Sequence, residues 1–353
     1  MSFRSHTTLQ SRRRLKIIRM AGGMISLRSD TRLLTVSAIL FLASLAGIAF
    51  SLSTGAYHIR LTDVLATLVG NGDEQMRLVV LEWRLPRVLL AFLLGMALGM
   101  SGAIFQSLTR NPLGSPDVIG FATGSYTGGL VVMLFLSGGY YATAAGALTG
   151  GLVTALLVYL LTYRQGIQGF RLIVVGIGVA AMLQALNAWM IRRAELDVAM
   201  SAALWGAGSL NGLGLEQLWP VLITLLVLLP PLALLVRPMR QLEMGDDMAA
   251  ASGVQIGATR VFLIVLGVAL TGLATAAAGP ISFVALCAPQ IARRLTRSAG
   301  VDLVSSALTG ALLLIGADYI AQHAFGFQFP VGVMTVSLGG LYFIWLLIKE
   351  ARK

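Results

Sequence analysis

Long apolar runs separated by short polar segments make up the chain from residue 33 to its end. Most runs reach the ~20 residues that a helix needs to cross the hydrocarbon core of a bilayer. An outer-membrane barrel would instead show alternating segments of ~10 residues. The pattern predicts an all-α polytopic membrane protein with ten transmembrane spans: 33–52, 87–108, 117–136, 142–161, 172–190, 218–235, 261–278, 281–292, 303–323 and 331–348.

Glycine and proline mark special positions inside these spans. Gly95 with Gly99, and Gly146 with Gly150, form G-x-x-x-G faces, which allow close contact between helices in lipid. Pro280 separates two runs, of which the second, 281–292, is short. We expect that segment to be tilted, interfacial or partly re-entrant, with protein or a cavity around its broken backbone.

The distribution of charge predicts the orientation. Charged residues make up 12% of the chain, and the formal net charge is +11. With the N-terminus inside and alternating spans, 20 of the 26 Lys and Arg residues fall on inner segments and six on outer ones. Cytoplasmic loops collect Lys and Arg, so no nucleic-acid partner is needed to explain the excess. We expect a multi-pass membrane protein with both termini in the cytoplasm.

Residues 1–32 are polar and rich in Arg. We expect a basic, disordered cytoplasmic extension, followed by a single transmembrane domain at 33–353. The positive region of a cleaved signal is the alternative, but the next apolar run is long for such a signal. Met20 and Met24 are alternative starts.

The residue types that catalysis or metal binding would need are scarce. None of the three lysines is followed by Ser or Thr, so the chain has no G-x-x-x-x-G-K-[ST] phosphate loop. A single cysteine and three scattered histidines predict no internal disulfide and no metal site. We expect a chain that is not an enzyme, has no cofactor of its own and depends on partner subunits for ATP hydrolysis.

Two inner segments are candidates for contact with such partners. In the loop 110–117, Ser115 suits a helix N-cap and Asp117 suits the positive end of the helix dipole. An ordinary tight turn is the alternative. In the polar stretch 237–260, Asp246 and Asp247 fit the first turn of a short helix that ends at Gly253. We interpret this helix as a docking element, and a solvated loop helix is the alternative.

Arg84 and Arg87 lie at the outer end of the second span, against the charge bias. They would suit an acidic protein surface, and lipid headgroups are the alternative. Asp318 is the only acid well inside a span. A buried hydrogen bond to a neighbouring helix is favoured over a proton relay.

An ordered succession of motifs resembles the permease subunits of iron–siderophore and vitamin B12 ABC importers, the FecCD type. It covers about residues 33–353 and includes Glu82–Arg87, Gly102–Gln106, Thr109–Asp117, Gly208–Leu210, Gly245–Asp247, Gly279–Phe283, Ala288–Arg293 and Pro330–Val333. The resemblance implies the ten-helix vitamin B12-permease fold of type II importers. It also implies two ATP-binding subunits, a second and different permease subunit, and a periplasmic siderophore-binding protein. The location that it implies is the bacterial inner membrane.

The resemblance also implies roles for particular residues. Those that couple to the ATPase would be Glu243, Gly245, Asp246, Asp247, Ala250 and Gly253. Those that dock the binding protein would be Arg84 and Arg87, and the family's loop motif falls on Arg110, Asn111, Pro112, Gly114 and Asp117. Two departures stand out: Gln290 occupies the usual histidine position, and Gln322 and His323 stand where an outer arginine is expected.

The implied cargo is a ferric siderophore, favoured to be an enterobactin-like catecholate, moved from periplasm to cytoplasm. Cobalamin and other ferric chelates share the same permease skeleton and stay open. An ion-gradient-driven secondary transporter is the alternative from another class, although it would need intramembrane acids that are scarce here. A membrane scaffold or sensor subunit is a third.

Overall fold

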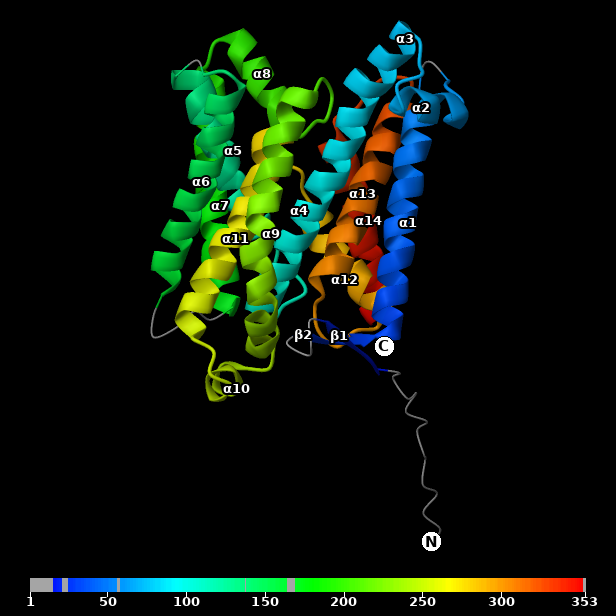
Figure 1. Cartoon of the computed structure of the whole chain (residues 1–353). Coiled ribbons are helices and arrows are strands. Elements are labelled where there is room, and N and C mark those ends of the chain that lie inside the picture. The colour runs from blue at the N-terminus through cyan, green and yellow to red at the C-terminus, as the bar shows by residue number, and fades with distance from the viewer. Residues whose placement is uncertain (1–14, 21–24, 56–57, 137, 164–168, 352–353) are drawn as a thin grey trace.

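The computed structural model describes residues 15–20, 25–55, 58–136, 138–163 and 169–351. These residues fold into helices that run back and forth between two ends of a bundle (Figure 1). The helices are α1 (Thr31–Ser53), α2 (Leu61–Leu68), α3 (Glu74–Arg77), η2 (Leu78–Arg84), α4 (Leu85–Thr109), α5 (Phe121–Phe135), α6 (Tyr140–Thr162), α7 (Gly169–Arg193), α8 (Leu196–Gly206), α9 (Leu215–Glu243), α10 (Asp246–Ala251), α11 (Ile256–Ala278), α12 (Val284–Thr296), α13 (Leu303–His323) and α14 (Val331–Ala351).

Each predicted span coincides with a helix, so the all-α polytopic fold is confirmed. Among the described residues, seven helical stretches are long and apolar enough to cross a bilayer. The predicted spans 117–136, 281–292 and 331–348 correspond to α5, α12 and α14. Of these, α12 has only 13 residues, in line with the prediction of a short segment.

The polar segments between spans contain more helix than the sequence predicts. The segment before the second span contains α2 and α3, and a π-helix, η2, runs directly into α4. Its apolar side packs in a small core with Leu52, Ile59 and Val64. Pro86, the second residue of α4, has no backbone N–H and cannot donate an α-helical hydrogen bond. The π-helix therefore ends next to a position where an α-helix would lack this hydrogen bond in any case.

The basic extension contains two short strands. β1 (Leu15–Met20) pairs antiparallel with β2 (Ile25–Asp30), where the sequence predicted disorder. Residues 1–14 and 21–24 lie outside the described residues, as do Arg164, Arg352 and Lys353, which entered the charge argument. The division into an extension and one permease domain stays a prediction.

The centre of the bundle is α4, packed against α11 and α13. A Cβ at Gly95 would lie 2.5 Å from the carbonyl oxygen of Gly310 on α13, and one at Gly99 would strike the carbonyl of Ser306. Ser101 on α4 donates a hydrogen bond to the carbonyl of Gly267 on α11 at 2.7 Å. The tight contact predicted for Gly95 and Gly99 is therefore confirmed.

The second predicted glycine face is also confirmed. A Cβ at Gly150 would lie 2.8 Å from the Cα of Gly128 on α5, and one at Gly146 would lie 2.7 Å from its carbonyl oxygen. Because lipid provides no hydrophobic drive for helix association, such backbone contact is what holds α5 and α6 together.

Between α11 and α12 the helical structure is interrupted inside the bundle. Gly279 and Phe283 both have positive φ, +75° and +69°. The carbonyl of Ala278 accepts a hydrogen bond from the N–H of Ser209 at 2.8 Å. The loop after α8 thus covers the break, as expected for irregular backbone at membrane depth.

The two ends of the bundle differ in their elements. The start of α1, the end of α14 and the short helix α10 lie at one end, and α2, α3 and α8 lie at the other (Figure 1). We call these the α10 end and the α8 end. This arrangement agrees with an even number of spans.

Candidate functional site

The predicted short helix in the stretch 237–260 is α10, and its capping is confirmed. Asp246 and Asp247 lie in the first turn. Gly245 and Gly253 flank the helix with φ of +119° and +81°, backbone that favours glycine. Ala249 is buried against the bundle, whereas Ala250, in the same helix, is exposed.

The outer face of α10 is apolar with one charge. Met248 in α10 is 56% exposed, Asp247 before it is also exposed, and Met244, two residues before the helix begins, is 62% exposed. Methionine and other adaptable apolar side chains are enriched at protein interfaces. The helix therefore offers a small surface suited to another protein at the end of the bundle.

An arginine pair fixes α10 to two spanning helices. Arg260, at the start of α11, forms an ion pair with Asp246 in which one guanidinium nitrogen donates to both carboxylate oxygens, at 2.7 and 2.9 Å. Arg110, just after α4, also pairs with Asp246. Burial alone would raise the pKa of the Asp246 carboxyl, but the hydrogen bonds and charges of Arg260 and Arg110 outweigh burial and hold this pKa below its ordinary value.

The loop motif meets the stretch 237–260 through Arg110. This residue is left-handed, with φ of +49°, and its Nε donates to the carbonyl of Leu242 at 3.0 Å. The Asn111 side chain accepts a hydrogen bond from the N–H of Leu113 at 2.9 Å and closes a turn around Pro112. A Cβ at Gly114 would strike Thr109, so this position requires glycine.

For Asp117 the predicted position at the N-terminus of its own span is wrong. The chain makes a separate turn at 116–120, and α5 begins only after Gly120, whose φ is +88°. The carboxylate of Asp117 instead accepts a hydrogen bond from the N–H of Phe283 at 3.1 Å. Asp117 thus meets the N-terminus of α12, which the break after α11 brings to it.

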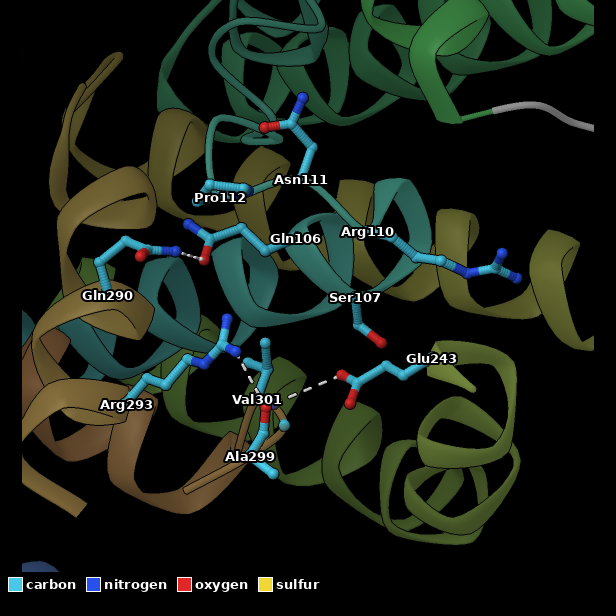
Figure 2. Close-up of a pocket in the computed structure, with 11 residues that line it drawn as sticks. Gln106, Ser107, Arg110, Asn111, Pro112, Glu243, Gln290, Arg293, Ala299 and Val301 are labelled. Atoms are coloured by element: carbon cyan, nitrogen blue, oxygen red, sulfur yellow. Dashed lines mark hydrogen bonds between the residues drawn. The ribbon is translucent and has the colours of Figure 1, made fainter. Parts of the chain in front are cut away.

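A polar pocket of about 190 Å³ lies beside the loop 110–117 at the α10 end (Figure 2). Glu243, the last residue of α9, accepts a long hydrogen bond from the N–H of Val301 at 3.4 Å. The hydroxyl of Ser107 is buried, points into the pocket and has no partner among the described residues. Arg293 donates to the carbonyl of Ala299 at 3.0 Å. Glu243 therefore lies against the loop between α12 and α13.

Gln290, in the position where histidine is usual, has a defined role. Its amide donates to Oε1 of Gln106 at 2.5 Å, and Gln106 donates to the carbonyl of Leu286 at 2.9 Å (Figure 2). These bonds join α4 and α12 beside the pocket.

At the α8 end the two arginines have separate partners. Arg84 is part-buried and donates to the carbonyl of Leu52 at 2.7 Å. Arg87 forms an ion pair with Asp318 on α13, with contacts of 2.8 and 3.1 Å. The side chains of Arg87 and Asp318 are 12% and 3% exposed. Gln322 donates to the same carboxylate at 2.6 Å.

The prediction that Asp318 bonds to a neighbouring helix is thus confirmed. The sequence did not identify Arg87 as its partner, because Arg87 was assigned to the outer surface. The ion pair between Arg240 and Asp302 at 3.0 Å was also missed. In the first case the available signal was an acid inside one span and an arginine at the end of another, and in the second it was a charged residue just outside each of two apolar runs.

The sequence-predicted residues fall into two groups. Arg110, Glu243 and Asp246 come together at the α10 end, and Arg84 and Arg87 lie at the opposite end. Within the described part of the chain, no group of three or more His, Cys, Asp or Glu residues could hold a metal ion.

Comparison with known proteins adds three findings. The sequence model of a family described as the FecCD transport family matches residues 41–349. The chain is 52% identical to the ferric enterobactin transport system permease protein FepG of Escherichia coli, over 91% of this chain and 98% of that protein. It is 36% identical to the achromobactin transport system permease protein CbrC of Dickeya dadantii, over 87% of this chain and 89% of the other.

A solved structure, described as an inward-facing conformation of a metal-chelate type ABC transporter, has a similar fold. Its TM-score is 0.78 at 25% identity, and the match covers 89% of this chain and 99% of that chain.

Proposed function

The chain belongs to the FecCD transport family, and we propose that it is the permease subunit of an ABC importer for a ferric siderophore of the enterobactin-like catecholate type. The observation that carries this proposal is the 52% identity to FepG, which extends over 98% of that protein. The cargo would arrive with its iron already wrapped by the chelator, so the chain needs no iron ligands of its own.

We propose that the α10 end faces the cytoplasm and that α10 is the element that the ATP-binding subunits grip. Support comes from its exposed methionine face and from the ion pairs that connect Asp246 to α4 and α11. A movement imposed on α10 would reach both spanning helices through these pairs. The coupling residues would be Glu243, Gly245, Asp246, Asp247, Ala250 and Gly253.

We further propose that the α8 end faces the periplasm and receives a siderophore-binding protein. Arg84 and Arg87 would meet its acidic side chains by charge-assisted hydrogen bonds. Two ATP-binding subunits and a second, different permease subunit would complete the importer. The ATP-driven cycle would open the pathway to each side in turn, since ATP favours one state of the complex over the other.

The test is uptake into vesicles that contain this chain with its co-purifying ATPase and second permease, and the binding protein inside or outside as topology requires. Labelled ferric catecholate, ferric hydroxamate, ferric citrate and cobalamin are offered in parallel. We expect ATP-dependent accumulation of the catecholate. Preference for another chelate would change the cargo assignment. Uptake that does not require ATP but is lost when the ion gradient is dissipated would refute the ABC mechanism.

A further inference from the structure

Helix α13 has a polar tie near each of its ends, and each tie reaches one of the two proposed sites. Near the α8 end, Asp318 holds Arg87 of the docking pair at 2.8 Å. At the α10 end, Asp302, the N-cap of α13, holds Arg240 of α9 at 3.0 Å. The preceding residue, Val301, donates its N–H to Glu243, three residues before Asp246. One helix thus connects the docking arginine with the coupling segment.

The segment of α13 between Asp302 and Asp318 is suited to move as a rigid unit. Asp302 and Asp318 are 16 residues apart, which is about 24 Å along a helix. Midway, Gly310 packs against the backbone of α4 so closely that a Cβ there would lie 3.1 Å from the Cα of Gly99 and would strike the carbonyl of Gly95. Helices whose backbones are in such close contact cannot slide past each other gradually. We therefore expect α13 and α4 to move together, as one rigid unit.

The Arg87–Asp318 pair can be exchanged, whereas the glycine contacts cannot. Both side chains are largely buried, and Arg87, at 12% exposed, is more accessible than Asp318, at 3%. An acidic side chain of a docked protein that draws Arg87 outward would leave Asp318 with Gln322 as its remaining partner. A buried carboxylate without its counter-charge is costly, so the docked state favours a different position of α13.

We propose that α13 transmits docking of the binding protein to the coupling segment, with Asp318 as the group that senses docking and Asp302 as the group that passes the shift to α9. Both are positioning residues and touch no cargo. This inference rests on the proposed function, because it needs an ATPase at the α10 end and a binding protein at the α8 end.

The test compares the reconstituted wild-type importer with Asp318→Asn and Asp302→Asn. The readouts are the Kd of the loaded binding protein and the ratio of ATP hydrolysis with and without it. Asparagine keeps side-chain volume, and at position 302 it also keeps the helix cap. The matched control is Asp73→Asn, a cap position of α3 at the α8 end, for which the structure shows no ion pair.

We expect both variants to lose about fivefold or more of the stimulation, the lower range of coupling between sites. Asp302→Asn should do so while the binding protein still docks, because the Asp302–Arg240 pair is distant from the docking surface, and the control should match wild type. Full stimulation in Asp302→Asn overturns the role of α13, even if Asp318→Asn fails to fold. A wild-type importer that shows neither docking nor stimulation overturns the proposed function together with this inference.

Discussion

Replacement of Asp246 by Asn should loosen α10 from the bundle. The carboxylate accepts two hydrogen bonds from Arg260, whose side chain is 10% exposed, and pairs with Arg110 as well. A charge-assisted hydrogen bond contributes about 1.5–3 kcal/mol, while an exposed ion pair contributes about 0–1 kcal/mol. Because Asp246 is 43% exposed, we expect the loss of its ion pairs to destabilise the packing of α10 by about 1–2 kcal/mol, a value between these ranges.

A loss of this size raises the open fraction of α10 about tenfold, since 1.4 kcal/mol corresponds to a factor of ten. Hydrogen exchange of the backbone amides of α10, such as that of Ala249, measures this opening directly. Asp247→Asn is the matched control, because Asp247 is the exposed neighbour in the same turn. Equal exchange in the two variants would show that the arginine pair does not hold α10. Transport should fall together with the protection of α10.

Three further outcomes are expected. The folded state depresses the pKa of Asp246, so its stabilisation is fully present above the ordinary pKa of about 3.9 and is lost as pH falls through the lower folded value; protection of α10 should be flat between about pH 5 and 8 and fall only in acid. Gly310→Ala should cost about 1–3 kcal/mol through overpacking against α4, measured by thermal unfolding, whereas Gly316→Ala in the same helix, with open space around it, should be neutral. Arg84→Gln keeps a donor toward the Leu52 carbonyl but removes the charge, so docking should weaken about tenfold and become less dependent on salt; unchanged docking would exclude Arg84 from that surface.

The sequence was sufficient to predict the elements whose signal is local. The run 303–323 coincides with α13 at both ends, because hydropathy over one span needs no knowledge of its neighbours. The caps of α10 were predictable for the same reason, since Asp246, Asp247 and Gly253 act within a few residues. The π-helix η2 was not, because a one-residue widening of the turn leaves the apolar pattern almost unchanged.

Pairing between distant residues was beyond a single sequence. Arg87 and Asp318 are 231 positions apart, and Asp117 meets Phe283 only because the chain breaks at Gly279. Each of these residues satisfied a local rule, as an outer arginine or as a helix-capping acid. In the structure, the partner of each residue instead comes from a distant part of the chain. A buried charged side chain needs such a partner because burial without one is costly.

The contacts between helices differ in kind along the depth of the bundle, and the difference bears on how the protein can move. Ion pairs of Arg87, Arg110, Arg240 and Arg260 connect α13 or α10 to neighbouring helices near the ends of the bundle. Between the ends, α4 meets α13 through glycine backbones. Ion pairs can exchange partners, but interlocked backbones have no side chain that could yield. A change of state is therefore expected to move α4 and α13 as one body and to rearrange the ion pairs that this body makes with α9 and α10 at the α10 end, which is the motion that alternating access requires of a permease whose energy is supplied from outside the membrane.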